Sequence, residues 1–338
     1  MNHPKQKIRT AIIGYGLSGE LSHAYGIQAN PEFEITAVCD LSHERRTYAE
    51  ENLGCQSFPD HMQLLRSMPE LDLAAIVTRS DTHCSIACDF LRAGVDVLIT
   101  KPWALNSQEA GTMIRVQNES KQRIFPWIPM YWSPEYLKIK ELLNQGVIGT
   151  PFTFRRYITQ FSKRSDWQTQ LKHGGGYLNN WGAHIVQPLL ALANSPVVKI
   201  TGHMQQVINS GDADDNFLAV MTFENGILAV AEYAQAVEGL PSFMIQGTSG
   251  MIRSDGNTIT LIQKDPSTSD APNKREFPIE GKLYGDEAHI YRDVAATLLC
   301  GAPFKATPEE SYYGTAILDA VRDSHQSKNT PLPTPYKN

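Results

Sequence analysis

The segment Ala11–Gly19, AIIGYGLSG, constrains the fold of this chain more than any other stretch. An apolar run is followed there by Gly14, Gly16 and Gly19, in the spacing G-x-G-x-x-G. In that spacing the first glycine permits a tight turn, the second lets a pyrophosphate approach the backbone, and the third lets a helix pack closely on the preceding strand. The segment therefore predicts a strand, a phosphate-binding loop and a helix.

A second apolar run ends in Asp40, where an acidic side chain can hold the ribose of a dinucleotide. A carboxylate there accepts hydrogen bonds from ribose hydroxyl groups and repels a 2′-phosphate, which favours NAD(H). Arg45 and Arg46 follow, and their charges could instead receive a 2′-phosphate, so NADP(H) remains the alternative. The expected cofactor contacts in this part of the chain are Gly14, Tyr15, Gly16, Leu17, Ser18, Gly19 and Asp40.

Length and composition narrow the class of protein. A chain of 338 residues exceeds the usual size of one domain, so two domains are expected. The net charge of −6 offers no basic face for nucleic acid. The N-terminus is polar and no apolar run approaches the length of a membrane span, so we expect a cytoplasmic enzyme without membrane contact.

The five cysteines do not suggest a metal site or a disulfide framework. Cys84 and Cys88 are four residues apart, as one helix face would place them, but no further Cys/His pair completes a zinc set. We expect reduced structural thiols and no bound metal.

The first part of the chain alternates strand and helix signals after the phosphate-binding loop. Repeated β-α units of this length require parallel strands joined by right-handed crossovers. We therefore expect a doubly wound parallel sheet of the Rossmann type in residues 1–127. Further strands are predicted at 71–78, 95–99 and 123–127, and helices at 85–93 and 107–119, with Asn106 or Ser107 as the N-cap of the last.

From Pro134 the pattern changes to β-rich runs, which predict a large, mostly antiparallel open sheet in residues 128–306. Asn225-Gly226 between two of the runs is a strong hairpin signal. The predicted strands are 151–159, 197–207, 216–223, 227–234, 242–246, 251–253 and 258–263, with helices at 135–143 and 180–193 and a surface loop at 264–274. Two late helices are expected at 286–299 and 309–324; the second, within about 307–325, is expected to pack back on the nucleotide domain.

Thr100-Lys101-Pro102 follows the predicted strand 95–99. Ligands of open α/β sheets bind outside the carboxyl ends of the strands, so Lys101 is expected to point at the cofactor. Pro102 fixes the backbone and forces Lys101 into an extended conformation. The alternative is a solvated lysine at a strand end.

A second segment with chemical potential is His173–Leu190, HGGGYLNNWGAHIVQPLL. Its three glycines permit backbone conformations that other residues do not tolerate. Asn180 and His184 are four residues apart on one face of the predicted helix, and Gln187 continues that face. An imidazole and an amide presented together after a glycine turn suggest a substrate site; a structural histidine is the alternative.

Taken together, these segments resemble the glucose–fructose oxidoreductase / inositol dehydrogenase (Gfo/Idh/MocA) family, from Ile8 to about Ser324. The family's Glu-Lys-Pro motif matches Thr100-Lys101-Pro102, and its glycine run with a following Asp and His matches residues 174–184. The resemblance implies hydride transfer between nicotinamide C4 and a hydroxyl or ketone of a sugar, sugar acid, polyol or cyclitol. It implies that Lys101 holds the substrate oxygen, that His184 takes or gives the proton, and that the two groups meet at one carbon.

The chain departs from the family pattern at three places. Asn180 replaces the Asp and Thr100 replaces the Glu, while Arg79 stands where a Pro-Asn pair is usual before His83. Two lost acids and one added cation predict a more positive site that prefers an anionic or carbonyl-rich substrate. The further expected cofactor contacts are Thr78, Arg79, His83, Lys101 and Pro102, and the expected substrate contacts are Lys101, Trp127, Tyr131, Trp167, Asn180 and His184, of which Lys101, Asn180 and His184 are catalytic.

Two other functions stay open at this point. One is an NAD-dependent glycosidase or lyase that oxidises its substrate transiently and returns the hydride. The other is a non-catalytic sensor that binds the nucleotide. The resemblance also implies a homo-oligomer, a dimer or tetramer, formed through the open face of the sheet.

Overall fold

The computed structural model describes residues 7–327 and 332–333. The chain divides into two compact units, and each is described by itself. The first contains the chain up to Pro129 together with Gly285–Tyr312, and the second contains Met130–Tyr284 and the chain from Tyr313 onward.

The first unit is built on a six-stranded sheet with the order β3-β2-β1-β4-β5-β6, in which all paired strands run parallel. The order reverses beside β1, which is the arrangement of a doubly wound dinucleotide-binding sheet. This confirms the predicted fold class of the N-terminal part. The strands are β1 (Ile8–Ile13), β2 (Phe33–Cys39), β3 (Gln56–Phe58), β4 (Leu73–Ile76), β5 (Asp96–Ile99) and β6 (Ile124–Pro126).

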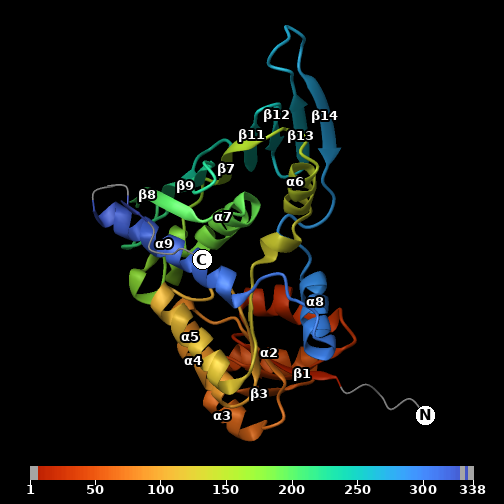
Figure 1. Ribbon diagram of the computed structural model, residues 1–338. Coiled ribbons are helices and arrows are strands. Elements are labelled where there is room, and N and C mark those ends of the chain that lie inside the picture. Colours follow the sequence, from red (N-terminus) through yellow and green to blue (C-terminus); the bar gives the residue numbers. More distant parts are fainter. Residues whose placement is uncertain (1–6, 328–331, 334–338) are drawn as a thin grey trace, which may run out of the picture. The chain divides into compact units, whose positions relative to one another are not determined.

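Helices connect these strands, and α4 and α5 lie side by side (Figure 1). The Asn106 side chain accepts a hydrogen bond from the Glu109 amide at 2.9 Å, so Asn106 is the N-cap of α5. The first connection begins as a π-helical segment, η1 (Gly19–Ala24), before one α-helical turn. The remaining elements are α1 (Tyr25–Gln28), α2 (His43–Leu53), α3 (His61–Ser67), η2 (Ser80–Thr82), α4 (His83–Arg92) and α5 (Ser107–Ser120).

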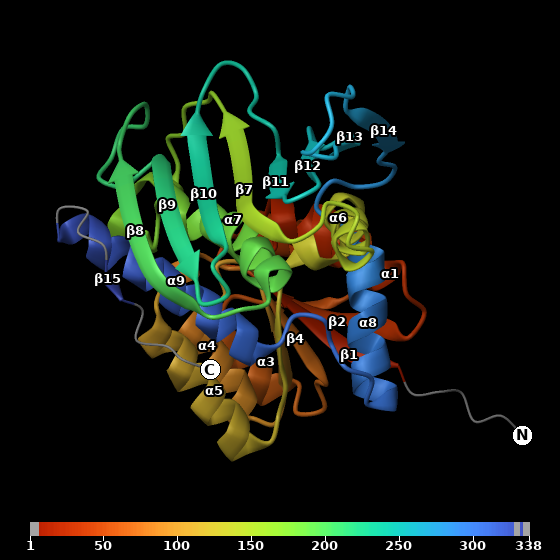
Figure 2. The ribbon, with the colours of Figure 1, turned by 45° about the horizontal axis from the view of Figure 1, so that its top comes forward.

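The second unit contains a nine-stranded sheet with the order β14-β13-β12-β11-β7-β10-β9-β8-β15 (Figure 2). Its pairs are antiparallel except β7 with β10, which confirms the prediction of a mostly antiparallel sheet. The strands are β7 (Pro151–Gln160), β8 (Val197–Gln205), β9 (Asn216–Phe223), β10 (Leu228–Gln235), β11 (Phe243–Gly247), β12 (Gly250–Ser254), β13 (Thr258–Gln263), β14 (Asn273–Pro278) and β15 (Leu332–Pro333).

One face of this sheet is covered by α7 (Tyr177–Ala193), which contacts β7, β9 and β10 (Figure 2). The apolar residues of α7, such as Ile185 and Leu189, are fully buried in the core that these strands share. The unit also contains η3 (Pro129–Trp132) from Met130 onward, α6 (Pro134–Asn144), η4 (Trp167–Thr169) and η5 (Leu171–His173).

The two late helices are distributed between the two units differently from the expectation. Helix α8 (Glu287–Cys300) belongs to the first unit, where it packs against α1. A Cβ on Gly26 of α1 would lie 2.5 Å from the Tyr291 ring, so this contact is close. The ring of Tyr291 also meets those of His23 and Phe33 edge-on.

Helix α9 (Pro308–Gln326) begins in the first unit, where the Ser311 carbonyl accepts from the Trp103 indole. From Tyr313 it belongs to the second unit, with Leu318 and Val321 in that core. The expectation placed the whole of α9 on the nucleotide domain and α8 elsewhere. Both helices are amphipathic, and amphipathicity does not say which sheet a helix covers.

No helix in the described part of the chain is long and apolar enough to cross a bilayer.

Candidate functional site

The three glycines after β1 have different structural needs. Gly14 has φ +96°, and a Cβ there would lie 2.7 Å from the carbonyl oxygen of Val77. A Cβ on Gly19 would overlap the carbonyl oxygen of Gly14. At Gly16, by contrast, the nearest atom to a Cβ is Arg45 Nη1 at 3.5 Å, an ordinary contact. The protein itself therefore leaves room at Gly16, where the motif expects a pyrophosphate to approach.

This difference gives a prediction that separates folding from nucleotide binding. Gly16→Ala should keep the melting temperature and weaken NAD⁺ affinity by about tenfold or more, because the methyl group would occupy the place where the motif expects the pyrophosphate. Gly19→Ala should lower the stability by about 1–3 kcal/mol, because the new atom forces the backbone apart. Thermal unfolding and fluorescence titration with NAD⁺ check both variants. Normal NAD⁺ binding by a stable Gly16→Ala protein would contradict the assignment of this loop.

Asp40 lies directly after β2, and its carboxylate makes hydrogen bonds and an ion pair within the protein. It accepts the Tyr15 amide and the Ser42 amide, each at 2.8 Å, and pairs with Arg45 at 3.5 Å. Arg46 donates to the carbonyl oxygen of Asp40 at 2.8 Å. Both arginines therefore contact Asp40, the residue expected to hold the ribose. Leu17 is 75% exposed on the neighbouring loop.

His83 connects the loops that follow β4 and β5. Its Nδ1 lies 2.8 Å from the carbonyl oxygen of Pro102, and its Nε2 lies 3.0 Å from that of Thr78. Burial lowers the pKa of His83, and the two carbonyl contacts act in the opposite direction. Both ring nitrogens face these carbonyl oxygens rather than a cofactor, and a neutral ring donates to one of them, so His83 links the loop after β4 to the segment containing Lys101.

The residues around Lys101 are themselves fixed. The Thr100 hydroxyl donates to the carbonyl oxygen of Ile76 at 3.0 Å, which ties the end of β5 to β4. The Lys101–Pro102 peptide bond is cis. Thr100 thus serves a structural hydrogen bond at the position where the family motif has a Glu. Lys101 stands at the carboxyl edge of the parallel sheet, as predicted.

Arg79 does not add an uncompensated charge. Its guanidinium contacts the Asp81 carboxylate at 3.1 Å and 3.2 Å. In the second unit, Arg164 pairs with Asp166. These two ion pairs weaken the expectation of a strongly positive site that prefers an anionic substrate.

The glycine turn before α7 is clamped by side chains. Gly174 and Gly176 have φ of +72° and +105°, which few other residues adopt. Asn179 donates from Nδ2 to the carbonyl oxygens of Gly174 at 3.1 Å and Gly175 at 3.0 Å. Arg322 of α9 donates to Asn179 Oδ1. The turn that leads into the candidate site is therefore anchored to a helix far along the chain.

Asp214, which the sequence reasoning missed, caps the N-terminus of α7. Its carboxylate accepts the Leu178 amide at 2.8 Å and its carbonyl oxygen accepts the Tyr177 amide at 2.8 Å. Burial raises the pKa of Asp214 to about 6, although the Leu178 amide and Arg322 favour the charged form. Capping by a residue distant from the helix leaves no local signal in the sequence.

The raised pKa of Asp214 predicts a pH-dependent stability. A group whose pKa is higher in the folded state contributes most below its unfolded pKa, near 4, and loses that contribution as the pH rises through about 6. Relative to an Asp214→Asn variant, the wild type should lose on the order of 2 kcal/mol between about pH 4 and pH 7. Urea unfolding across this range measures the difference. Parallel stability profiles for the two proteins would contradict the assigned pKa.

Asn180 and His184 share one face of α7, as predicted. Asn180 Nδ2 donates to Gln168 Oε1 at 2.6 Å, which orients the amide. His184 is 5% exposed, and its ring lies 5.6 Å from Trp181 and 5.3 Å from Tyr284. Trp181 could have been found within the motif itself. Tyr284 could not, because no local pattern links it to His184.

Two predicted substrate contacts lie in the protein interior. Trp127 is 7% exposed, with its ring 4.5 Å from His23 and 5.7 Å from Tyr291. Tyr131 is also 7% exposed, and its hydroxyl donates to Gln187 at 3.1 Å. Their burial favours a packing role for both residues. Trp167, in η4, is half-buried and remains available as a contact.

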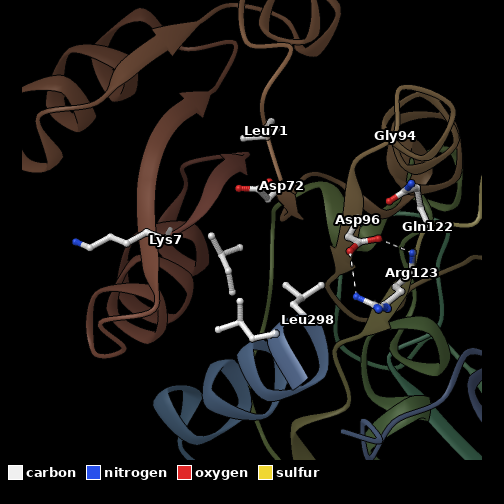
Figure 3. A pocket seen from close by; sticks show the side chains of 10 residues that line it. Lys7, Leu71, Asp72, Gly94, Asp96, Gln122, Arg123 and Leu298 are labelled. Atoms are coloured by element: carbon white, nitrogen blue, oxygen red, sulfur yellow. Dashed lines mark hydrogen bonds and ion pairs between the residues drawn. The ribbon is translucent and has the colours of Figure 1, made fainter. Parts of the chain in front are cut away.

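A pocket of about 370 Å³ lies in the first unit, at the edge of the sheet opposite the phosphate-binding loop. Asp96 within it accepts the Arg123 amide at 2.6 Å (Figure 3). Asp72 accepts the Arg9 amide at 2.8 Å. The carboxylates of this pocket therefore already accept hydrogen bonds from backbone amides of the protein. The lining residues are Lys7, Ile8, Leu71, Asp72, Gly94, Asp96, Gln122, Arg123, Leu298 and Leu299.

The cysteines of the described chain are free thiols. Within residues 7–327 and 332–333, no three His, Cys, Asp or Glu side chains are grouped to hold a metal ion.

Comparison with known proteins identifies both units. Residues 8–126 match the model of an oxidoreductase family with an NAD-binding Rossmann fold. Residues 136–253 match the GFO/IDH/MocA C-terminal domain. The chain is 23% identical over 353 residues to the scyllo-inositol 2-dehydrogenase (NADP(+)) IolW of Bacillus subtilis, covering 96% of this chain and 95% of that protein.

Solved structures support the fold. An NAD-binding protein from Listeria innocua superposes with a TM-score of 0.88 at 24% identity, covering 97% of each chain. GenD2 from gentamicin A biosynthesis, solved in complex with NAD, superposes with a TM-score of 0.85 at 20% identity, covering 99% of this chain and 98% of that one.

Proposed function

The chain belongs to the Gfo/Idh/MocA family of NAD-binding oxidoreductases, and on that premise we propose that it interconverts a secondary hydroxyl group and a ketone on a carbohydrate-like substrate. The substrate class is a sugar, sugar acid, polyol or cyclitol. The observation that carries the proposal is the pairing of Asn180 and His184 on one face of α7, beyond a glycine turn that side chains hold in place.

Each residue has a defined part in this proposal. The amides of the phosphate-binding loop hold the pyrophosphate, and Asp40 holds the ribose of NAD(H), with NADP(H) as the alternative. The Lys101 ammonium stabilises negative charge that develops on the substrate oxygen. His184 takes the hydroxyl proton on a ring nitrogen during oxidation and returns it during reduction. Asn180 orients the substrate by hydrogen bonds and accepts no proton.

The nicotinamide ring, when bound, supplies the hydride acceptor for oxidation and the donor for reduction. The protein's task is to orient the carbinol carbon and to move one proton. An imidazole suits this task because its unperturbed pKa lies close to neutral pH.

We also propose that the protein forms a dimer or tetramer through the open face of its second sheet. On β9 the residues alternate between the buried core, such as Ala219 and Met221, and the opposite face. That opposite face includes Leu218, which is 36% exposed, and Leu228 on β10, which is 38% exposed. Apolar side chains on an open sheet face are typical of an interface.

The test of the proposed function is a panel of sugars, sugar acids, polyols and cyclitols incubated with NAD⁺ or NADP⁺. We expect reduced nicotinamide to accumulate with at least one member, in proportion to the ketone formed. Release of an aglycone without net reduction of the nucleotide would indicate the glycosidase or lyase function instead. Nucleotide binding without turnover of any member would indicate a sensor.

A further inference from the structure

Two half-buried aromatic side chains flank His184 within the second unit. The ring centroids of Trp181 and Tyr284 lie 5.6 Å and 5.3 Å from that of His184, and 6.3 Å from one another. The face of an aromatic ring carries partial negative charge, so it attracts the weakly positive hydrogens of C–H bonds. The proposed acid/base group is therefore bordered by surfaces suited to C–H groups.

Trp181 is held in place from behind. Its indole stacks on the Tyr233 ring, with centroids 5.6 Å apart and planes at 30°. Tyr233 is fully buried, its hydroxyl donates to Gln160 at 3.1 Å, and its ring meets Tyr177 edge-on at 4.7 Å. Because this stack is anchored in the core, the indole keeps its orientation when a ligand arrives.

Tyr284 is supported by a buried polar cluster. Burial raises the pKa of its phenol, an effect that Glu135 reinforces and Arg156 opposes, so Tyr284 carries no charge at neutral pH. Arg156 is itself fixed, since it donates to the carbonyl oxygens of Tyr157 and Ser242, both at 2.9 Å, and lies 4.4 Å from the centre of the Phe243 ring.

We propose that Trp181 and Tyr284 form a stacking wall that selects substrates in ring form, an inference that rests on the proposed function. The planes of the two rings are inclined at 45°. A pyranose or cyclitol presents several C–H bonds on one rigid face, which can stack on one ring while its edge contacts the other and a hydroxyl group meets His184. An open-chain polyol has no fixed C–H face, and it must lose rotational freedom to form one. The wall therefore favours cyclic substrates over alditols.

The wall also replaces two of the expected substrate contacts. Trp127 and Tyr131 are each 7% exposed, so they offer little surface for stacking. Trp181 and Tyr284, in contrast, are half-buried and belong to the same unit as His184. They come from positions about a hundred residues apart in the chain, joined only by the fold.

The experiment is saturation-transfer NMR on the NAD⁺-loaded protein with myo-inositol and methyl glucoside as ring compounds, and with sorbitol and mannitol as alditols. We expect the strongest transfer to the C–H protons of the rings, with affinity about tenfold above that of the alditols. Trp181→Leu and Tyr284→Leu should each weaken ring binding by about tenfold, and Tyr284→Phe should change it by less than about threefold.

Phe277→Leu serves as the matched control, because Phe277 is a half-buried aromatic of β14 that packs under Lys138 at 4.9 Å, outside the wall. Unchanged NAD⁺ affinity and melting temperature show that each variant is folded. Three results would contradict the proposed stacking wall: equal binding of alditols and cyclic compounds, unaltered binding of cyclic compounds by the leucine variants, or no binding of any cyclic compound. Ring binding through the wall without hydride transfer would overturn the proposed function and leave the wall intact.

Discussion

A Lys101→Met variant is expected to lose turnover by about 10²–10³-fold while its NAD⁺ affinity changes by less than about threefold. Methionine keeps the length of the side chain and removes the ammonium group that stabilises charge on the substrate oxygen. The backbone on either side of Lys101 is held by hydrogen bonds from Thr100 to the carbonyl oxygen of Ile76 and between the Pro102 carbonyl oxygen and His83. The loss should therefore appear in kcat rather than in stability.

Steady-state kinetics with the substrate that the panel identifies, together with NAD⁺ titration, measure this effect. Lys305→Met is the matched control, since Lys305 is an exposed lysine of the same unit that pairs with Asp293 at 3.4 Å. Lys101→Arg should retain part of the activity because it keeps the charge with a different shape. Full turnover by Lys101→Met would remove this residue from the mechanism.

The parts of the structure that the sequence predicts are those determined by residues close together in the chain. The strand, loop and glycine spacing of Ala11–Gly19 lie within one short segment, so the pattern determines both the local fold and the binding site. Asn180 and His184 are likewise one helical turn apart, and their shared face follows from the geometry of a helix. The N-cap of α5 is narrowed by the sequence to Asn106 or Ser107, and Asn106 caps the helix, because capping is a local interaction.

The parts that the sequence does not predict depend on long-range contacts. The sequence of β14, NKREFP, is mostly polar. This segment forms a strand because β13 supplies its hydrogen-bonding partner. Asp214 caps α7 from 36 residues away from Leu178, and Tyr284 reaches His184 across a larger separation. Trp127 is an error of the opposite kind, a site residue that the sequence suggests and the fold buries. An aromatic residue that follows a strand can be expected to contact substrate, but Trp127 is 7% exposed.

A His184→Asn variant is expected to lose turnover by about 10²–10⁴-fold, because asparagine cannot exchange a proton at neutral pH. Its NAD⁺ affinity should stay within about threefold of the wild type, since the phosphate-binding loop and Asp40 belong to the first unit. The smaller side chain leaves Trp181 and Tyr284 in place, so ring compounds should still bind. Stopped-flow reduction of NAD⁺ and equilibrium titration measure the two quantities. A large loss of NAD⁺ affinity would move the role of His184 from proton transfer to cofactor binding.

The double variant Lys101→Met/His184→Asn tests whether both groups act on the same oxygen. If the ammonium and the imidazole stabilise one transition state, removing the second group after the first costs little, because residues that act as a unit are strongly non-additive. We therefore expect the double variant to turn over about as slowly as the slower single variant. Losses that multiply instead would mean that the two groups contribute independently, since distant sites without shared partners have additive free energies. Such a result would contradict the proposal that Lys101 and His184 act as one unit on a substrate hydroxyl group.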